Sequence, residues 1–295
     1  IVVDDCSTDS TIEIVNNLLK KIKIKIIVYK FDSNNGFASC SRNIGLEISN
    51  CKFTCFLDAD DIFLKNKCRE IKNYLLKNEF DALVHGYIKA QIEVSKNLIS
   101  LKSIWPIMIG TKFSFDELLL RWRTFSPTST IILKTKVGRN IRFSEEKGIK
   151  AGEDREILCR IAKHNYKVVG ISNLLTIYND SDSNGKSVNE SNEHITTPNN
   201  AINIFKYYRN NHKDIMLNKF YAQFELSNLI AIKRIKGNVK LFKQIFSFKI
   251  FEIILIFLAL IDNAKIFLKM YFLLKFKKKN LLLYLRENIL NFKIN

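Results

Sequence analysis

The chain has 295 residues, of which 47 % are hydrophobic, and its formal net charge at pH 7 is +18. This hydrophobic content excludes a disordered chain, and the length allows either one large α/β core with a smaller appendage or two modest domains. Only 3 prolines and 10 glycines are present and no internal repeat is visible, so few linkers are expected.

The first predicted elements alternate between strand and helix. They are a strand at 1–3, a helix within 7–22, a strand at 23–31, a turn at 34–36, a helix at 38–49 and an apolar strand at 53–57. The continuous apolar run at 53–57 is typical of a buried parallel strand. The order βαβαβ predicts a parallel sheet with right-handed crossovers.

The later elements are less regular. We predict a helix at 65–78, a strand at 81–88, an irregular stretch to about residue 125, a strand at 128–134 and a helix at 153–164. Residues 178–200 are polar and rich in turn formers, which indicates a mobile loop or linker. We therefore divide the chain into a domain at 1–200 and a basic helical region at 201–295.

Two groups of acidic residues directly follow predicted strands. Asp4 and Asp5 follow the first strand, and Asp58, Asp60 and Asp61 follow the strand at 53–57. Open α/β sheets bind ligands outside the carboxyl ends of their strands, so we expect both groups at one edge. Clustered carboxylates suit a hard divalent cation. The D-x-D spacing alone is weak evidence, because a solvated loop has the same composition.

The six cysteines include no C-x-x-C pair and have no histidines at metal-ligand spacing. We interpret them as buried small apolar residues of a protein from a reducing, cytosolic compartment. The chain opens on a strand without an initiating Met, and we interpret it as a fragment that lacks its true N-terminus.

Four segments occur in a recognisable order. They are VVDDCSTDST, NNGFASCSRNIGL, FLDADD and GEDREI, spread over roughly residues 1–175. In sequence and order they resemble the family 2 glycosyltransferases. This resemblance implies an α/β fold of the GT-A (Rossmann-like) type, with a mostly parallel sheet flanked by helices. Here the basic helical C-terminal region would follow it.

The resemblance also implies roles for individual residues. Asp4 and Asp5 would contact the uracil and ribose of a nucleotide-sugar, and Arg42 would lie near the nucleotide or its phosphates. Asp58 and Asp60 would form the D-x-D pair, with Asp60 as the metal ligand for Mn²⁺ or Mg²⁺. A further residue, Asp154, would be the general base on the acceptor hydroxyl, since a positioned carboxylate can accept that proton.

The implied activity is that of an inverting, metal-dependent glycosyltransferase. It would move a hexosyl or N-acetylhexosaminyl group from a nucleotide-sugar, expected to be UDP-linked, to a glycan or lipid-linked acceptor of a bacterial surface polysaccharide or lipooligosaccharide. Two departures from the family pattern stand out. Cys6 occupies a position that is usually Gly, and the loop after the E-D helix has no histidine ligand, since His194 lies late.

Other functions compete with this reading. A nucleotidyltransferase shares the fold class and the metal carboxylates, but such enzymes open with a glycine-rich basic loop that is not seen here. A non-catalytic nucleic-acid-binding or membrane-binding protein would explain the charge of +18 but not the acidic clusters, which repel a phosphate backbone. Trp105 and Trp122 are compatible with stacking on an acceptor sugar and equally with core packing.

The basic C-terminal region suggests a membrane surface as a partner. Residues 250–261 are apolar apart from Glu252, and lysines flank this run on both sides. A run of this length is too short to span a bilayer. We expect an interfacial helix at the cytoplasmic face of the inner membrane, with a core or dimer helix as the alternative. Nucleic acid is not an expected partner.

Overall fold

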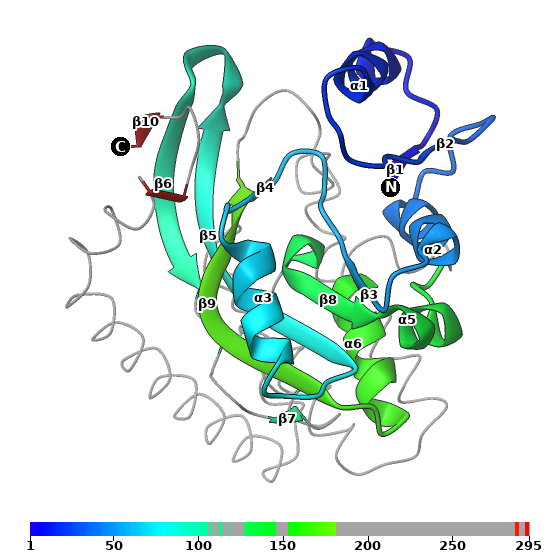
Figure 1. Ribbon diagram of the computed structural model, residues 1–295, viewed down its shortest axis with the longest axis vertical. Coiled ribbons are helices and arrows are strands. Elements are labelled where there is room, and N and C mark those ends of the chain that lie inside the picture. The colour runs from blue at the N-terminus through cyan, green and yellow to red at the C-terminus, as the bar shows by residue number, and fades with distance from the viewer. Residues whose placement is uncertain are drawn as a thin grey trace, which may run out of the picture.

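The computed structural model describes residues 1–105, 107, 112–113, 118, 127–145, 153–180, 287–288 and 293–294. In Figure 1 the N-terminal elements lie on one side of the molecule, and the long strands of the main sheet lie on the other. Two sheets are described: a small N-terminal pair of strands and a sheet of eight strands.

The N-terminal unit is the expected strand, helix and strand. β1 (Val2–Asp4) and β2 (Val28–Lys30) pair in parallel, with Val3 opposite Tyr29, and α1 (Thr11–Leu19) connects them. No residue of α1 is buried. This unit therefore contributes little to the hydrophobic core.

The second helix, α2 (Ala38–Ile48), packs against β1 and against α5 (Thr135–Ile141). The two helices approach closely at Gly138. A Cβ added there would lie 2.7 Å from Cδ2 of Leu46, a residue that is itself buried, so a larger residue would force the helices apart.

The larger sheet is built around one long strand. Its other members are β3 (Phe53–Cys55), β4 (Ile62–Phe63), β6 (Leu98–Trp105), β7 (Lys112–Phe113), β8 (Ile131–Lys134), β9 (Val168–Asn179) and β10 (Lys293–Ile294). The central strand, β5 (Ala82–Glu93), pairs with β9 along most of its length. Its opposite edge pairs first with β8 and then with β6, which returns after a short 3₁₀ turn, η1 (Val94–Lys96).

The sheet is mixed, which corrects the expectation of a mostly parallel one. β5 and β9 run parallel, but β8 is antiparallel to both β3 and β5, and β4 and β7 are antiparallel to β9. The physical reason is that β5 and β6 form a hairpin and β8 enters the sheet from the opposite end. Neither connection is the helical crossover that a parallel pair needs.

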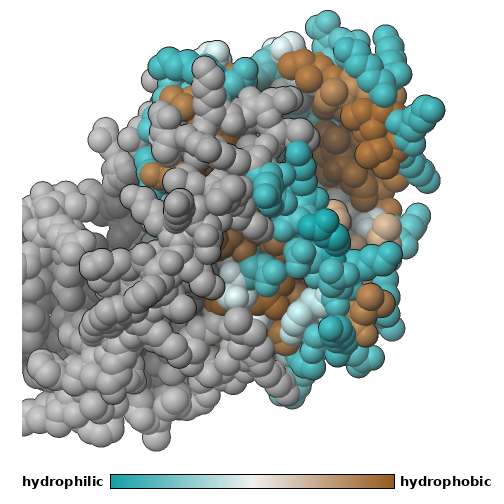
Figure 2. All heavy atoms as spheres, turned by 60° about the vertical axis from the view of Figure 1, so that its left-hand side comes forward, coloured by the Kyte–Doolittle hydropathy of each residue, from teal (hydrophilic) through white to brown (hydrophobic). Residues whose placement is uncertain are grey.

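Helices cover both faces of the central strands. Alternate residues of β5 and β8 point to opposite faces. Ala82 and Ile131 belong to an apolar cluster that contains Ile157 of α6 (Glu153–Lys163). Leu83 belongs to a second cluster, which contains Ile71 of α3 (Lys67–Leu75). On the face shown in Figure 2, the apolar side chains of the described residues gather in patches that hydrophilic side chains border.

The fold class predicted from the sequence is confirmed, and several elements were missed. The helices near residues 38–49, 65–78 and 153–164 are present with slightly shorter bounds. The strands β6 and β9 were not predicted. The linker at 178–200, apart from its first three residues, lies outside the described residues. So does the predicted basic helical region from residue 201, apart from 287–288 and the strand β10, so the division at residue 200 stays a prediction.

The cysteines are only partly as expected. All six are free, in agreement with the absence of a disulfide framework. Their predicted burial is wrong for three of them, because Cys51, Cys55 and Cys68 are exposed, whereas Cys159 is buried.

Candidate active site

Hydrogen bonds from nearby residues hold both carboxylates of the first acidic turn. The carboxylate of Asp4, which is buried, accepts hydrogen bonds from the peptide N–H (3.1 Å) and the hydroxyl of Ser7. The carboxylate of Asp5 accepts from the peptide N–H (2.9 Å) and the side-chain amide (2.8 Å) of Asn35. The NNG turn therefore holds Asp5, which was not foreseen.

Cys6 explains why glycine is usual at its position. Its φ is +64°, in the left-handed region that residues with a Cβ rarely adopt. The departure noted in the sequence therefore places backbone strain on Cys6.

The second acidic turn is held by distant segments. Its turn closes with a hydrogen bond from the Asp61 N–H to the Asp58 carbonyl (3.0 Å). The Asp58 N–H donates to the hydroxyl of Ser129 (3.0 Å), and the Asn179 N–H donates to the Asp61 carboxylate (2.9 Å). Burial raises the pKa of Asp61 to about 7. Partial burial also raises the pKa of Asp60, with the Asp58 charge adding to the effect.

Arg42 joins three motif segments. Its guanidinium donates to both carboxylate oxygens of Asp58 (3.0 and 3.2 Å) and to Glu153 at the start of α6 (2.6 Å). The Arg42 side chain is 10 % exposed, and it also lies over the ring of Phe143. Charge-assisted bonds of this kind are strong, so the two carboxylates are held on either side of one cation.

Asp154 lies beside this bridge. It is partly buried, and one carboxylate oxygen accepts a hydrogen bond from the Arg155 N–H (2.7 Å). Burial raises the pKa of Asp154, and the neighbouring Glu153 carboxylate raises it further, while Arg42 opposes the shift. A carboxylate with a raised pKa is a better proton acceptor when ionised, as a general base must be.

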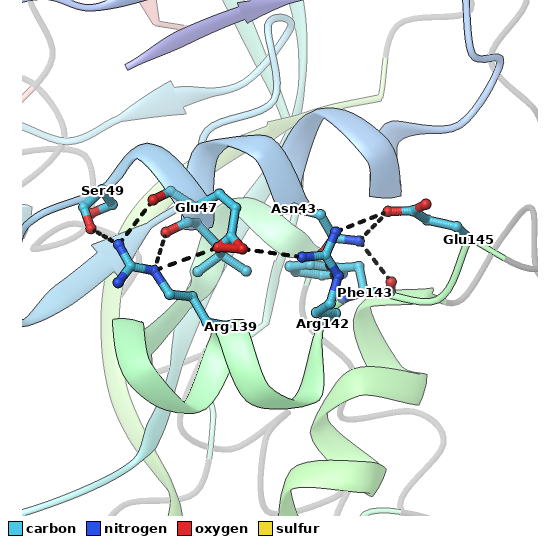
Figure 3. Close-up of polar contacts among 8 residues, drawn as sticks. Asn43, Glu47, Ser49, Arg139, Arg142, Phe143 and Glu145 are labelled. Atoms are coloured by element: carbon cyan, nitrogen blue, oxygen red, sulfur yellow. Dashed lines mark hydrogen bonds and ion pairs between the residues drawn. The ribbon is translucent and has the colours of Figure 1, made fainter.

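Hydrogen bonds between α2 and residues 139–143, in α5 and directly after it, position the helix that carries Arg42 (Figure 3). Asn43 is buried, its side-chain amide donates to the Phe143 carbonyl (2.9 Å), and its amide oxygen accepts from the Phe143 N–H (2.8 Å). Arg139 of α5 donates to the Leu46 carbonyl (2.9 Å) at the end of α2. The asparagine of the S-R-N motif is thus structural, and it fixes the helix that carries Arg42.

A buried lysine, Lys67, contacts the residues that hold the second acidic turn. The Lys67 ammonium donates to the Ser129 carbonyl (2.6 Å) and the Thr176 hydroxyl (3.3 Å), and it lies 3.4 Å from the ring centroid of Phe63. Burial lowers the pKa of Lys67 to about 7. Ser129 therefore connects the two residues: its carbonyl accepts from Lys67, and its hydroxyl accepts from the Asp58 N–H.

The structure brings together some of the predicted residues and leaves others apart. Arg42, Asp58 and Asp154 gather around one bridge, with Glu153 as a partner that the sequence suggested only as half of the E-D pair. Asp5 lies near the start of α2. Burial raises the pKa of Cys40 there, and the charges of Glu145 and Asp5 raise it further. The contacts of Arg42 with a nucleotide remain a prediction.

Sequence reasoning missed Lys67, Ser129 and Asn179. One signal was available for Lys67, because it stands four residues before the buried Ile71 and so falls on the core-facing stripe of its helix. Ser129 and Asn179 gave no signal, since their role depends on how β8 and β9 meet the turn.

A divalent cation was expected at Asp60, and the donor atoms there are of the right class. The Asp60 carboxylate makes no hydrogen bond with another of the residues that the structure describes, and the buried Oδ2 of Asp61 has no partner among them. No group of three His, Cys, Asp or Glu side chains is placed to hold a metal within the described ranges. The Asp60 and Asp61 carboxylate oxygens are of the class that Mg²⁺ takes, and Mg²⁺ commonly completes its shell with water and phosphate oxygens, so a cation at this turn stays a prediction.

Among the described helices, none is long and apolar enough to cross a membrane. The predicted interfacial segment at 250–261 falls outside the described residues.

The small parallel pair of strands, the mixed sheet with helices on both faces, and the acidic turns after β1 and β3 together form a GT-A fold. Solved structures agree. The chain aligns with Staphylococcus aureus TarS 1–349 in complex with UDP-GlcNAc at a TM-score of 0.57 and 20 % identity, covering 81 % of this chain and 67 % of that one. The complex of the same protein with UDP gives a TM-score of 0.54 and 21 % identity, with 82 % and 66 % coverage.

The sequence comparison agrees with this fold. Residues 1–137 match the family model described as glycosyl transferase family 2. One relative, an uncharacterized glycosyltransferase of Haemophilus influenzae, is 38 % identical over 143 residues, which are 48 % of this chain and 53 % of the relative. The amylovoran biosynthesis glycosyltransferase AmsB of Erwinia amylovora is 29 % identical over 181 residues, with 60 % and 58 % covered.

A third relative is the poly(ribitol-phosphate) beta-N-acetylglucosaminyltransferase TarS of S. aureus, which is 32 % identical over 162 residues. The match covers 52 % of this chain and 25 % of TarS. The chain thus spans about half the length, or less, of these curated relatives.

Proposed function

We propose that the chain is an inverting glycosyltransferase that moves a sugar from a nucleotide-sugar to a glycan or lipid-linked acceptor. The observation that carries this proposal is the bridge from Arg42 to Asp58 and Glu153, because it sets Asp154 beside the D-x-D turn. A base and a donor site must be this close for transfer in one step.

The reaction needs one base and no enzyme nucleophile. The acceptor oxygen bonds to the anomeric carbon, the bond from that carbon to the diphosphate breaks, and the hydroxyl proton passes to the Asp154 carboxylate. A single displacement inverts the anomeric configuration. Burial supports this role of Asp154, because it raises the pKa of the carboxyl group toward the pH at which the enzyme would work.

The donor would lie across the two acidic turns. We assign the uracil and ribose to Asp4 and Asp5, and the phosphate side to Arg42 and Asp58. Asp60 would hold Mn²⁺ or Mg²⁺, which when bound would neutralise charge on the diphosphate leaving group. UDP as the nucleotide is supported by the UDP and UDP-GlcNAc complexes of TarS, and the transferred group would be a hexosyl or N-acetylhexosaminyl unit.

The names of the relatives support a role in surface polysaccharide synthesis. AmsB is named for amylovoran biosynthesis, and TarS for transfer of N-acetylglucosamine to poly(ribitol-phosphate). The proposed role extends to lipooligosaccharide synthesis.

The test separates binding from chemistry at Asp154. Asp154→Asn keeps the shape of the side chain and loses the proton acceptor, so transfer from UDP-sugars should fall by roughly 10²-fold or more while UDP affinity persists. Glu93→Gln, at the far end of β5, is the matched control and should leave both unchanged. Equal loss of affinity and turnover in Asp154→Asn would assign Asp154 a structural role instead.

We extend the proposal to the cytoplasmic face of the inner membrane. Its support is the apolar run at 250–261 with flanking lysines, a pattern that suits an anionic lipid surface. A chain ending at Gly237 should stop sedimenting with anionic liposomes, and added salt should weaken binding of the full chain. If the full-length protein does not bind such liposomes at low salt, the segment packs against protein instead of lipid.

A further inference from the structure

One face of the β6–β5–β9 part of the sheet carries aromatic and polar side chains. In the register of the strands, Tyr87 lies opposite Trp105, and Lys89 lies opposite Tyr178. Residues paired across strands share a face, as do residues two apart on one strand. The alternate residue Ile88 faces the opposite side, where it is buried in an apolar cluster.

Three rings meet on this face, which we call the aromatic face (Tyr87, Trp105 and Tyr178). Tyr87 lies in the middle: the Trp105 ring is nearly parallel to it, with centroids 6.2 Å apart, and the Tyr178 ring meets it edge-on at 6.1 Å. Tyr87 is 9 % exposed, whereas Trp105 and Tyr178 are partly exposed. The outer two rings are thus held by the inner one and still reach the surface of the described part.

Hydrogen-bonding capacity remains on the aromatic face. The Trp105 indole N–H donates to Ser103 (2.8 Å), but neither tyrosine hydroxyl bonds to another of the described residues. Burial raises the pKa of Tyr178 to about 12, with a further effect from nearby carboxylates, so its hydroxyl stays protonated at neutral pH. Two hydroxyls that can both donate and accept stand among apolar ring surfaces.

The aromatic face borders the candidate active site. Tyr178 directly precedes Asn179, whose peptide N–H holds the Asp61 carboxylate (2.9 Å). The charge of Asp154 acts on both Tyr87 and Tyr178, which places these rings near the candidate base as well. A molecule on this face would therefore lie close to both the D-x-D turn and Asp154.

The charged groups beside the aromatic face are already paired. The Asp180 carboxylate binds the ammonium groups of Lys89 (2.9 Å) and Lys102 (3.1 Å). The Lys102 ammonium also donates to the Asp180 carbonyl (2.6 Å). One carboxylate is bonded to both ammonium groups, so the trio has a net charge of only +1 and offers little attraction for a polyanion.

We propose that the aromatic face binds the acceptor substrate through a neutral pyranose ring, with an acceptor hydroxyl directed to Asp154; this inference rests on the proposed glycosyltransferase function. A pyranose has an apolar C–H face that suits an aromatic ring, and hydroxyls at its edge that suit tyrosine hydroxyls. Few convergent polar groups on an aromatic surface are what a small-ligand site needs. An acyclic phosphate-bearing acceptor has no such ring face.

The test reads out binding at Trp105 directly. The protein has two tryptophans, so the fluorescence of a Trp122→Phe protein reports on Trp105 alone. We would titrate this protein with methyl β-glucopyranoside, methyl β-galactopyranoside, methyl β-N-acetylglucosaminide and ribitol 5-phosphate, each in the presence of UDP and Mn²⁺. The expected result is a saturable change with at least one pyranoside and none with ribitol 5-phosphate.

Variants at Tyr178 separate this idea from a general loss of structure. Tyr178→Leu should raise the Kd for the pyranoside by about tenfold, and Tyr178→Phe, which restores a flat ring, should recover most of that loss. Leu76→Ala, an exposed apolar position at the end of α3, is the control and should bind like the parent protein. No saturable response to any pyranoside, or equal affinity in Tyr178→Leu and Tyr178→Phe, would overturn the proposal.

Measuring UDP affinity in the same samples distinguishes the two levels of inference. If UDP binds in the presence of Mn²⁺ and no pyranoside does, the assignment of the aromatic face to the acceptor is wrong and the proposed function stands. If UDP fails to bind and no UDP-sugar is turned over, the proposed function itself is wrong.

Discussion

The two acidic turns of the candidate site differ in what holds them. In the first turn, Asp4 and Asp5 bond to Ser7 and Asn35, which belong to the small N-terminal unit. The second turn depends on α2, α6, the 3₁₀ turn η3 (Thr128–Thr130) and the end of β9, all parts of or attached to the main core.

This difference shows which part of the site is rigid. Removing a buried hydrogen-bond partner costs more folding free energy than removing an exposed one, because the polar atom that remains cannot bond to water. The first turn should tolerate change and adjust to a ligand. The second turn should report any change through the stability of the whole domain.

The largest expected effect is on transfer activity, which a variant of the second turn should lose far more than a variant of the first. Asp60→Ala should reduce transfer by roughly 10²-fold or more and weaken metal-dependent UDP binding, since its carboxylate is the proposed cation ligand. Asp5→Ala should mainly raise the KM for the nucleotide-sugar. Steady-state kinetics with UDP-sugars and Mn²⁺ would measure both, and near-normal turnover in Asp60→Ala would show that the metal site is assigned wrongly.

The second effect concerns pH and the buried Lys67. Its pKa is lowered from 10.5 to about 7 in the folded protein, so its contribution to stability is fully present above pH 10.5 and is lost as the pH falls toward 7. Relative to Lys67→Met, the wild-type protein should therefore lose stability, on the order of a few kcal/mol, between pH 10 and pH 7. Thermal unfolding of both proteins across this range would measure it. A constant difference would show that Lys67 titrates normally.

The third effect compares one serine from each turn. Ser129→Ala removes a buried hydroxyl and leaves the Asp58 N–H without its partner, which should cost about 1–3 kcal/mol. Ser7→Ala removes a partly exposed hydroxyl and should cost about 1 kcal/mol or less. Urea denaturation of the two variants gives the comparison directly. Equal losses would mean that both turns are equally coupled to the core.

The smallest effect is a gain in stability. Cys6 adopts a positive φ that glycine accepts without strain, so Cys6→Gly should stabilise the protein by about 0.5–1 kcal/mol after the extra entropy of the unfolded chain is counted. Ser7→Gly, next to it, has no such strain to relieve and should not stabilise. An unchanged or lower midpoint in Cys6→Gly would indicate that the weak Cys6 thiol contact to the Asp32 carbonyl matters more than the strain.

Sequence reasoning found the fold class because strands, acidic turns and helices alternate over short distances. It placed Asp58 and Asp154 in one site only through the family resemblance, since the residues that join them are far apart in the chain. β6 and β9 were missed because their register depends on β5, whose pairing no local pattern encodes. The mixed sheet was missed for the same reason.

Single residues show the same limit. The spacing of Lys67 on its helix could have predicted burial, but a lysine is ordinarily taken as exposed. Arg42 was assigned to the nucleotide, whereas the structure shows its guanidinium engaged by two carboxylates of the protein. Which of these bonds a bound diphosphate would exchange depends on a ligand and cannot be derived from the chain's pattern.

The bond from Arg42 to Glu153 spans 111 positions of the chain, whereas the bond from Arg42 to Asp58 spans 16. During synthesis, α2 and the second acidic turn emerge well before α6, and the turn must also wait for Ser129 and Asn179, which hold it. Contacts of such long separation form slowly, because closing the loop costs entropy before the bond is gained. Assembly of the candidate site should therefore be among the last events of folding, after the chain beyond α6 has been made.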